Sequence, residues 1–596
     1  MCGIVGYLGK EDARALILKG LTRLEYRGYD SAGIALYNNE KNVFSIYKDK
    51  GRVANLEQLT DFSYETNQGI GHTRWATHGV PNKVNSHPHK SSTDSFYIVH
   101  NGVVDNYLEL KQEYLPESTF ESETDTEVIA HLIELFSASM STSAAIRKTM
   151  SLLEGSYALA IIDTKDRDRL YAAKNKSPLL LGIGEDGLII ASDIMAFVGH
   201  SKSYIPLPDK SYVEIYKDTY KILDIIGMEM DYEVKTINVD YMNIEKGEYS
   251  HFMMKEINEQ PSVIRRIIGK YFDEDGNVIK ISKRIFKEIE ESDRIYIIGA
   301  GTSMNAGFIG KELFEKLTNI PVEVHIASEF AYNMPILSKK PLFLFISQSG
   351  ETADLRAVLV NAKTQGYRTL TLTNVKTSTL AREADNYVNL YAGPEIAVAS
   401  TKAYTAQIAV LSILAYELSD KSMNLKHELS KVAYSIESII EQKEYIESLV
   451  KKYLTKRNCF YIGRSIDYFA SLESALKLKE ISYIQSEGFA AGELKHGTIA
   501  LIEEGTPVIA IISQRKINKN TRSNLQEVIS RGAKAIVIST KRVHEPTDQI
   551  VVDDVYELFS PLLTIIPSQL IAYYAALHRG YDIDKPRNLA KSVTVE

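Results

Sequence analysis

The chain has 596 residues, too many for one hydrophobic core, and domains of roughly 100 to 200 residues predict about three or four units. Hydrophobic residues make up 44% and charged residues 24%, the balance of an ordinary globular protein. The formal net charge of -8 argues against a nucleic-acid binder, which needs a clustered basic surface. We therefore expect partners that are small molecules or proteins.

The chain has only two cysteines, Cys2 and Cys459, which are too few for a disulfide framework. We therefore expect a reducing compartment, the cytoplasm. The first residues lack a basic segment followed by a long apolar one, so no signal peptide is expected. The most apolar stretch, residues 558–577, is interrupted by Pro561 and Pro567, and we predict no membrane span.

Residues 2–240 alternate short β-type segments with turn residues. The segments are GIVGYLG, SAGIALYN, SFYIVHNG, YALAIIDT and LIIASD, and two amphipathic helical patterns accompany them. This pattern predicts packed antiparallel sheets with helices, an α+β domain. Residues 241–250 are polar and charged, which predicts a linker.

Two later segments, 284–424 and 453–586, contain continuous apolar runs that end in small or hydroxyl residues before a helical period begins. This is typical of buried parallel strands in α/β units. RIYIIGAGTS and PLFLFISQSGET in the first segment correspond to CFYIGRS and PVIAIISQ in the second. Gly299 to Ser347 is 48 positions and Gly463 to Ser513 is 50, so the spacing repeats as well. We predict two tandem α/β subdomains of one type, followed by a tail at 587–596.

The second residue is the first candidate for chemistry. Removal of Met1 would leave Cys2 with a free α-amine, whose pKa of about 7.7 to 8.0 suits a base near neutrality. One residue could then supply both nucleophile and base. The dipeptide Cys2-Gly3 alone is more often just the start of a strand.

Three further motifs favour the catalytic interpretation. Arg74 carries a guanidinium suited to a carboxylate, beside Trp75. Asn101 and Gly102 follow the apolar run FYIV, where an amide and a backbone N–H can form an oxyanion hole, although Asn-Gly is often only a turn. Asp125 opens a helical pattern, as a cap or as a partner for an ammonium.

Five of the 13 histidines lie in this part of the chain, which raises the question of a metal site. Their spacing matches no HExxH motif and no cysteine pair accompanies them. We interpret them as packing and hydrogen-bonding residues and expect no metal. They are His72, His78, His87, His89 and His100.

The motifs CGIVG, YRGYDSAG, HTRWATHG, HNG and ETDTE, in that order, resemble the class II glutamine amidotransferases, which are N-terminal nucleophile hydrolases. The resemblance implies an αββα sandwich over residues 2–240 that binds L-glutamine. It also implies that Cys2 is the nucleophile and that Asn101 and Gly102 form the oxyanion hole. The implied glutamine-binding residues are Arg74, Trp75, Thr77, His78 and Asp125.

The downstream repeat offers a phosphate site. Gly299-Ala300-Gly301 does not continue as a dinucleotide motif, because Met304 stands where the third glycine is required. Hydroxyl and amide side chains instead stand at the starts of two helical patterns, where they could bind phosphate or simply cap helices. These residues are Ser303, Ser347, Gln348, Ser349 and Thr352. The second copy reads Ser513-Gln514-Arg515-Lys516 instead, so we expect only the first copy to bind phosphate there.

Glu473, Lys477 and Glu480 follow at i, i+4 and i+7 on one face of a predicted helix, so an acid and a base can meet one ligand. The alternative is a solvated ion-pair face.

GTS, SQSGET, VASTKA, LKLKEISYI, GELKHG and PRNLAKSVTVE together resemble the tandem sugar isomerase (SIS) domains of the glutamine:fructose-6-phosphate aminotransferase family. The resemblance implies fructose 6-phosphate as a substrate, a homodimer and no cofactor. Glu480 would move a proton, His496 would assist ring opening at the partner's site, and Lys591 would form a Schiff base near Lys477. The implied phosphosugar residues are Thr302, Ser303, Ser347, Gln348, Ser349, Thr352 and Ser400, and the implied ammonia-channel residues are Trp75, Ala590 and Val593.

The expected reaction is therefore the synthesis of glucosamine 6-phosphate and glutamate, the first step of amino-sugar biosynthesis. Ala300 and Thr498 depart from residues common in that family, and neither is an implied catalytic group. Two alternatives stay open: another ketose phosphate as the acceptor, or a catalytically silent sugar-phosphate sensor. The sensor predicts loss of Cys2, Glu480 or Lys591, and all three are present.

Overall fold

The computed structural model describes residues 2–76, 78–237 and 246–593. The chain forms two compact units, Met1–Met242 with Ser592–Glu596, and Asn243–Lys591. We call them unit 1 and unit 2. Half of the predicted linker at 241–250, residues 241–245, lies outside the described residues.

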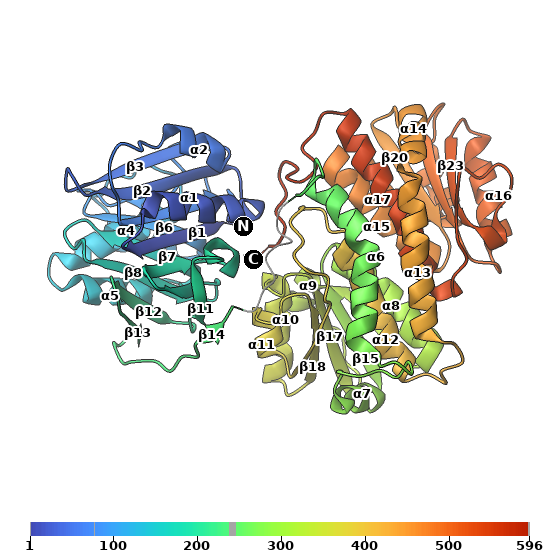
Figure 1. The fold of residues 1–596 in the computed structure, drawn as a ribbon, viewed down its shortest axis with the longest axis horizontal. Coiled ribbons are helices and arrows are strands. Elements are labelled where there is room, and N and C mark those ends of the chain that lie inside the picture. The colour runs from blue at the N-terminus through green and yellow to red at the C-terminus, as the bar shows by residue number, and fades with distance from the viewer. Residues whose placement is uncertain (1, 77, 238–245, 594–596) are drawn as a thin grey trace. The chain divides into compact units, whose positions relative to one another are not determined.

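Unit 1 contains two antiparallel sheets (Figure 1). The eight-stranded sheet has the spatial order β14 (Lys235–Thr236), β11 (Ser201–Pro206), β9 (Leu180–Gly184), β10 (Gly187–Ala191), β1 (Gly3–Gly9), β4 (Gln68–Arg74), β2 (Ser31–Asn38) and β3 (Val43–Lys50). The six-stranded sheet has the order β13 (Tyr220–Asp224), β12 (Ser211–Tyr216), β8 (Arg169–Asn175), β7 (Gly155–Asp163), β6 (Phe96–Val104) and β5 (His89–Lys90).

Alternating side chains on the strands divide unit 1 into four layers. On β1, Ile4 packs with Val99 of β6 between the two sheets, whereas Val5 packs with Leu21 on the outer face. Helices α1 (Ala13–Leu24) and α2 (Val53–Leu59) cover the eight-stranded sheet. Helices α3 (Tyr107–Tyr114), α4 (Thr126–Ser137) and α5 (Thr142–Leu152) cover the six-stranded sheet. The predicted αββα sandwich is confirmed.

Unit 2 contains two five-stranded parallel sheets. The first has the order β16 (Val322–Ile326), β15 (Arg294–Gly299), β17 (Pro341–Ser347), β18 (Arg368–Thr373) and β19 (Asn386–Asn389). The second has the order β21 (Gln485–Ala490), β20 (Asn458–Gly463), β22 (Pro507–Ile512), β23 (Lys534–Thr540) and β24 (Ile550–Val552). The two sheets share one topology, which confirms the predicted tandem α/β architecture. We call them, with their helices, the first and second repeat.

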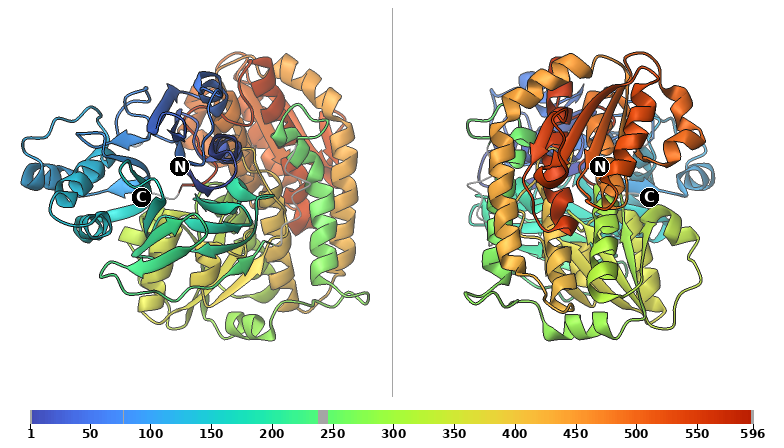
Figure 2. Two further views of the ribbon diagram at one scale, coloured as in Figure 1. Left: turned by 60° about the vertical axis from the view of Figure 1, so that its left-hand side comes forward. Right: turned by 90° about the vertical axis from the view of Figure 1, so that its right-hand side faces the viewer.

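Helices cover these sheets and fill the space between them within unit 2, and one apolar core runs through both repeats. Helices α6 and α13 pack side by side in this core, as Figures 1 and 2 show. The helices of the unit are α6 (Phe252–Tyr271), α7 (Lys283–Glu290), α8 (Thr302–Thr318), α9 (Ala327–Tyr332), α10 (Ala353–Thr364), α11 (Thr379–Glu383), α12 (Lys402–Glu417), α13 (Leu425–Glu441), α14 (Lys443–Tyr453), α15 (Ile466–Ser482), α16 (Asn518–Ile529) and α17 (Ser560–His578).

Helix α17 carries the most apolar segment of the sequence. Among the described residues it is the one helix long and apolar enough to cross a membrane, and the residues of that window are all buried. It packs against α13, α14 and α15, the pattern of a core helix. The expectation that prolines interrupt this stretch was wrong, because the helix continues through Pro567. Pro561 lies in its first turn, where a missing N–H costs nothing.

Candidate active site

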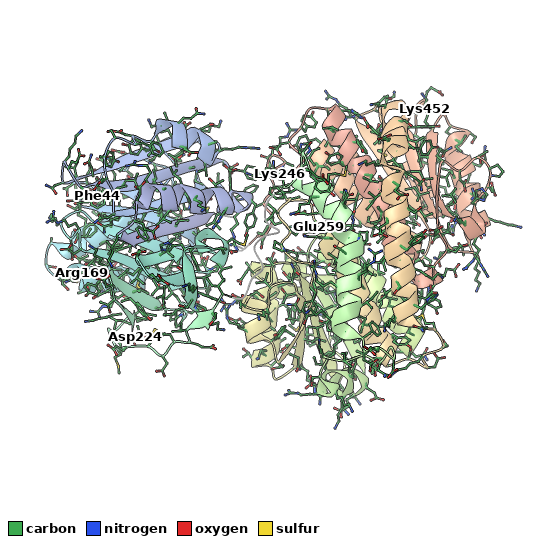
Figure 3. The ribbon with its side chains drawn as sticks, in the orientation of Figure 1. Phe44, Arg169, Asp224, Lys246, Glu259 and Lys452 are labelled. Atoms are coloured by element: carbon green, nitrogen blue, oxygen red, sulfur yellow. The ribbon has the colours of Figure 1, made fainter. Side chains whose placement is uncertain are left out.

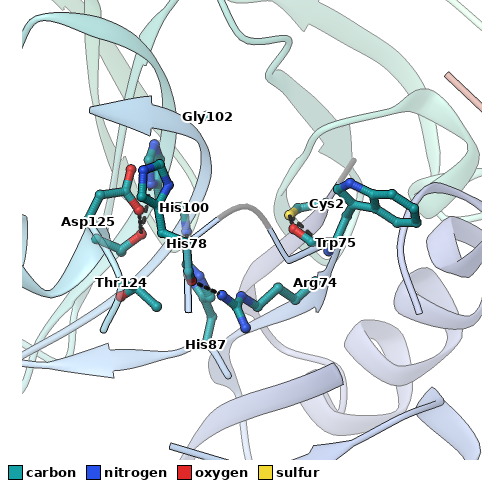
Figure 4. A pocket seen from close by; sticks show the side chains of 10 residues that line it. Cys2, Arg74, Trp75, His78, His87, His100, Gly102, Thr124 and Asp125 are labelled. Carbon is teal, nitrogen blue, oxygen red and sulfur yellow. Dashed lines mark hydrogen bonds between the residues drawn. The ribbon is translucent and has the colours of Figure 1, made fainter. Parts of the chain in front are cut away.

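Cys2 lies at the start of β1 beside the end of β4, because these strands pair antiparallel with Gly3 opposite Thr73. The backbone N–H of Trp75 donates to the Cys2 sulfur at 3.2 Å, and the sulfur lies 3.5 Å from the Trp75 carbonyl oxygen (Figure 4). Burial raises the pKa of the Cys2 thiol above its ordinary value. The thiol is therefore protonated at neutral pH and needs a base to become a nucleophile.

Asn101 points its amide at the N-terminal residue. Its Nδ2 donates to the Cys2 carbonyl oxygen at 2.9 Å, and its Oδ1 lies 3.0 Å from His72 Nε2. The same ring nitrogen lies 2.9 Å from the His100 carbonyl oxygen, which can only accept, so Nε2 carries the proton. Burial lowers the pKa of His72 to about 3, which keeps the ring neutral. His72 thus orients the Asn101 amide.

Gly102, the next residue on β6, must be glycine. Its φ angle is +138°, and a Cβ there would stand 1.9 Å from the Ser156 carbonyl oxygen on the neighbouring strand β7. Both the backbone conformation and the space exclude a larger residue. Gly102 also lines the pocket that Cys2 lines, which is the position expected of an oxyanion-hole residue.

A small pocket connects the predicted residues of unit 1. Arg74 and Asp125 bring a guanidinium and a carboxylate into the cavity that the thiol lines (Figure 4). The predicted residues that line it are Cys2, Arg74, Trp75, His78, Gly102 and Asp125. Thr77 lies outside the described residues.

Arg74 keeps one nitrogen free for a ligand. Its Nη2 donates to the carbonyl oxygens of His78 and Gly79, whereas its buried Nη1 has no hydrogen-bond partner in the part of the chain that the structure describes. An unpaired buried donor costs about 1–3 kcal/mol, which a ligand carboxylate would recover. Asp125 precedes α4 and turns away from it, because its Oδ2 accepts the backbone N–H of Val104 at 2.9 Å. It is a pocket residue and not a helix cap.

Asp30 had no predicted role, although the motif YRGYDSAG contains it. Its carboxylate accepts the backbone N–H of Ala76 at 2.9 Å, and its own N–H donates to the Arg74 carbonyl oxygen at 3.0 Å. Asp30 therefore fixes the segment that carries Arg74 and Trp75. Its position in a recognised motif was the available signal.

The buried histidines of unit 1 pack on one another. The rings of His72 and His87 stack with centroids 4.1 Å apart, and those of His87 and His89 meet edge to face at 4.6 Å. Burial lowers the pKa of each of these residues and of His100 below the ordinary value. They are therefore uncharged at neutral pH, and His87 and His100 line the pocket.

Unit 2 holds a second cluster on the predicted face of α15. Lys477 is fully buried, and its Nζ lies 2.7 Å from Glu480 and 3.4 Å from Glu473. The same Nζ donates to Thr302 Oγ1 at 2.9 Å, and that hydroxyl donates to Glu473 at 3.0 Å. Burial alone lowers the pKa of Lys477, but the two carboxylates raise it above its ordinary value. The alternative of a solvated ion-pair face is wrong.

The predicted phosphate residues gather at the carboxyl ends of β15 and β17, which are neighbours in the sheet. Ser347 Oγ accepts the backbone N–H of Gly350 at 2.9 Å and lies 3.3 Å from Thr352 Oγ1. Ser303 Oγ accepts from Gln407 Nε2 at 2.9 Å. Gln348 and Ser349 lie half-buried on the same loop. Helix N-termini that follow two adjacent strand ends can bind an anion through their backbone N–H groups.

Lys591 lies buried in unit 2 although it belongs to the tail. Its Nζ forms an ion pair with Glu395 and donates to Ser400 Oγ at 3.0 Å. Glu395 also accepts the backbone N–H groups of Thr401 and Ala403, each at 3.0 Å. The charge of Glu395 contributes to the raised pKa of Lys477, so the two clusters lie within electrostatic reach of each other. The sequence analysis missed Glu395, whose segment GPEIAVAS carries no spacing signal.

Other predicted residues are not brought to these clusters. His496 ends the exposed short helix η4 (Glu493–His496) and makes no hydrogen bond or ion pair with Glu480 or Lys591 within the described ranges. Ala590 is half-buried, and Val593 is 51% exposed.

The chain matches two known domain families and full-length relatives of one name. The SIS domain family matches residues 288–416 and 452–579, and a glutamine amidotransferase domain family matches residues 72–199. The glutamine--fructose-6-phosphate aminotransferase [isomerizing] of Listeria monocytogenes is 56% identical over 604 residues, with both chains covered completely. The protein of that name from Staphylococcus aureus is 55% identical, again over the full length of both.

Solved structures agree with these relatives. The C-terminal domain of glucosamine-fructose-6-phosphate aminotransferase from Francisella tularensis has a TM-score of 0.54 and 35% identity, covering 57% of this chain and 99% of that one. Tagatose-6-phosphate ketose/aldose isomerase from Escherichia coli shares the fold at a TM-score of 0.50 and 19% identity, covering 56% and 96%. The two relatives are more than half identical to this chain over their full length, and both domain families are matched. The chain therefore belongs to the glutamine--fructose-6-phosphate aminotransferase (isomerizing) family.

Proposed function

We propose that this chain transfers the amide nitrogen of L-glutamine to fructose 6-phosphate and yields glucosamine 6-phosphate and glutamate. The observation that carries the proposal is the cavity of unit 1, which Cys2, Arg74 and Asp125 line together. A thiol, a guanidinium and a carboxylate around one cavity suit an α-amino acid whose side chain is to be attacked. The full-length relatives supply the acceptor, since their name specifies fructose 6-phosphate.

The glutaminase step begins with the protonated thiol. Once Met1 is removed, the α-amine of Cys2 takes the thiol proton, and the sulfur attacks the side-chain carbonyl carbon of glutamine. Asn101 Nδ2 and the Gly102 N–H stabilise the oxyanion, while Arg74 binds the α-carboxylate and Asp125 binds the α-ammonium. Trp75, Thr77 and His78 complete the glutamine site. Collapse of the intermediate releases ammonia and leaves a thioester, which water hydrolyses to glutamate.

The synthase step uses the clusters of unit 2. The hydroxyls of Thr302, Ser303, Ser347, Ser349, Thr352 and Ser400, with Gln348, hold the phosphosugar. Lys591 gives its proton to Glu395, its partner in the ion pair, and the free amine condenses with the C2 carbonyl and expels water. Ammonia then displaces the lysine amine from C2. Glu480 moves a proton between C1 and C2, which converts the ketose imine into the aldose amine. Buried Lys477 holds the Glu480 carboxylate in position at 2.7 Å.

Ammonia must reach the second site unprotonated, because ammonium has no lone pair. We infer a closed route lined by Trp75, Ala590 and Val593, as in the family the chain belongs to. We also infer a homodimer, in which the exposed His496 assists ring opening at the partner's site. Both cysteines are free, as is usual in a reducing compartment, and we infer a cytoplasmic location.

The test is to incubate the protein with glutamine and fructose 6-phosphate, alone and together, and to measure glutamate and amino sugar. We expect amino sugar only when both are present. Consumption of glutamine without any amino sugar would refute the synthase assignment. Equal yields with several other ketose phosphates would refute fructose 6-phosphate as the specific acceptor.

A further inference from the structure

The two repeats of unit 2 can be aligned residue by residue at the turns that precede α8 and α15. Both helices contain 17 residues, and the residue before each has nearly the same conformation, φ 53° and ψ -126° at Gly301 and φ 53° and ψ -130° at Ser465. Both helices also end in a left-handed residue, Asn319 and Tyr483. Asp467 of the second repeat therefore corresponds to Ser303 of the first.

The neighbouring strands align in the same way. Strands β17 and β22 each begin with proline, Pro341 and Pro507. Counting from these prolines, Ser513 corresponds to Ser347 and Gln514 to Gln348. The second repeat thus keeps the strand-end serine and the amide of the proposed phosphate site, and it differs at Asp467.

Asp467 fills the position that an anion would take in the second repeat. Its Oδ2 accepts the backbone N–H of Ser513 at 2.8 Å, its Oδ1 accepts the Ser513 hydroxyl, and the backbone N–H of Gln514 also donates to the carboxylate. The Ser513 hydroxyl in turn lies 2.7 Å from that of Ser560. Asp467 is only 2% exposed. Consecutive backbone N–H groups and a hydroxyl at a strand end are the donors that bind phosphate in other proteins.

Among the described residues of the first repeat, no carboxylate accepts a hydrogen bond from the Ser347 hydroxyl. There the Ser347 hydroxyl contacts the Gly350 N–H and the Thr352 hydroxyl, and Ser303 is too short and neutral to replace a carboxylate. Arg515 and Lys516, which follow the second-repeat serine, are exposed and would favour an anion if the position were vacant. Both repeats therefore have similar hydrogen-bond donors at this position. They differ mainly in that the Asp467 side chain occupies these donors in the second repeat.

We propose that Asp467 is a specificity residue: its carboxyl group occupies the Ser513 donors and keeps the second repeat from binding a phosphate monoester, so that one phosphosugar binds per chain. This rests on the proposed phosphate site of the first repeat. It also predicts that serine at position 467, the residue of the first repeat, opens a second site. Without the carboxylate, the Ser513 N–H and hydroxyl lose their acceptor, and a phosphate would restore it.

The test counts binding sites by calorimetric titration with sorbitol 6-phosphate, an open-chain phosphate monoester that lacks the reacting carbonyl. We expect one site per chain in the unchanged protein, two in Asp467→Ser, and one in Asp467→Asn, whose amide still fills the space. An unchanged thermal unfolding transition of unit 2, which contains Asp467, serves as the control for folding. A folded Asp467→Ser variant with one site, or an unchanged protein with two, would overturn the proposal.

The titration has two other possible results. No site at all in the unchanged protein would overturn the proposed function, on which the inference rests. If Asp467→Ser does not fold, crystals of the unchanged protein soaked in inorganic phosphate decide the question. We expect density beside Ser347 and none beside Ser513, and phosphate beside Ser513 would contradict the role of Asp467.

Discussion

At the scale of single residues, the chemistry of unit 1 depends on a thiol that is protonated at rest. Burial raises the pKa of Cys2, and its nearest polar neighbours are backbone groups of Trp75. No titratable side chain hydrogen-bonds to this sulfur among the residues described. We therefore propose that, once Met1 is removed, the proton goes to the α-amine of Cys2 itself, which would account for a nucleophile at this position.

Replacing this thiol separates the two activities. We expect Cys2→Ala to abolish glutamine hydrolysis and to leave the affinity for sorbitol 6-phosphate unchanged, because the phosphosugar residues belong to unit 2. Glutamate release and calorimetric titration measure the two properties. Cys459→Ala is the matched control, since Cys459 is fully buried in β20 and should keep both. Loss of both properties in Cys2→Ala would contradict two separate sites.

Gly102 gives a second prediction at this scale. Gly102→Ala places a methyl group against the Ser156 carbonyl oxygen and should displace the oxyanion-hole N–H, which lowers kcat of glutamine hydrolysis about 10²–10³-fold. Steady-state glutaminase kinetics measure the effect. Gly199→Ala is the control, because Gly199 also has a positive φ but no neighbour within 4 Å of the added carbon. Equal losses in both variants would point to backbone strain and not to the oxyanion hole.

Site residues that belong to sequence motifs could be predicted from the sequence. The residues that hold them in position through hydrogen bonds and ion pairs could not. Cys2, Arg74, Gly102 and Asp125 were identified and line one cavity. The roles of His72, Asp30 and Glu395 emerged only from three-dimensional contacts, since each acts on a residue distant in sequence. Long-range hydrogen bonds of this kind leave no periodic signal in the chain.

At the scale of elements, helix α15 carries a buried ion cluster. Replacing Lys477 with methionine leaves Glu473 buried without its cation, so we expect Lys477→Met to lower the free energy of unfolding by about 3–5 kcal/mol. Chemical denaturation of unit 2 measures this. Lys479→Met on the exposed side of the same helix should change it by less than about 0.5 kcal/mol. A neutral effect of Lys477→Met would show that the cluster contributes nothing to stability.

Strands were predicted better than helices in this chain. Buried runs such as those of β15 and β17 are continuous and end in distinctive residues, so their sequence pattern is strong. Helices α6, α13 and α14 were not assigned, because their apolar faces carry no motif. Glu259, labelled on α6 in Figure 3, pairs with buried Lys402 of α12, a contact that only the fold reveals. Pro567 gave a misleading break signal, because α17 continues through it.

At the scale of the whole molecule, the buried histidines of unit 1 set its response to acid. Their folded pKa values lie below the ordinary value of about 6.5, so the unfolded chain binds protons first as pH falls. Stability is fully retained above about pH 6.5 and is lost as pH falls towards the folded pKa, which is about 3 for His72. Each histidine contributes a slope of about 1.4 kcal/mol per pH unit.

We therefore expect the melting temperature of unit 1 to fall steeply between about pH 6.5 and 4.5, with glutaminase activity lost alongside it. Differential scanning calorimetry at stepped pH measures this. His87→Phe preserves ring packing without a titratable nitrogen and should make the pH dependence shallower. An unchanged slope in that variant would mean that other groups cause the acid sensitivity.

In the proposed function, one chain releases ammonia from glutamine and delivers it to a phosphosugar. The most direct test supplies glutamine labelled with ¹⁵N at its amide, together with fructose 6-phosphate and an excess of unlabelled ammonium. Mass spectrometry then measures the isotope in the amino sugar. We predict that glucosamine 6-phosphate carries ¹⁵N with little dilution, because ammonia passes directly between the sites. An amino sugar with the isotope ratio of the bulk ammonium, or none while glutamine is consumed, would contradict the account.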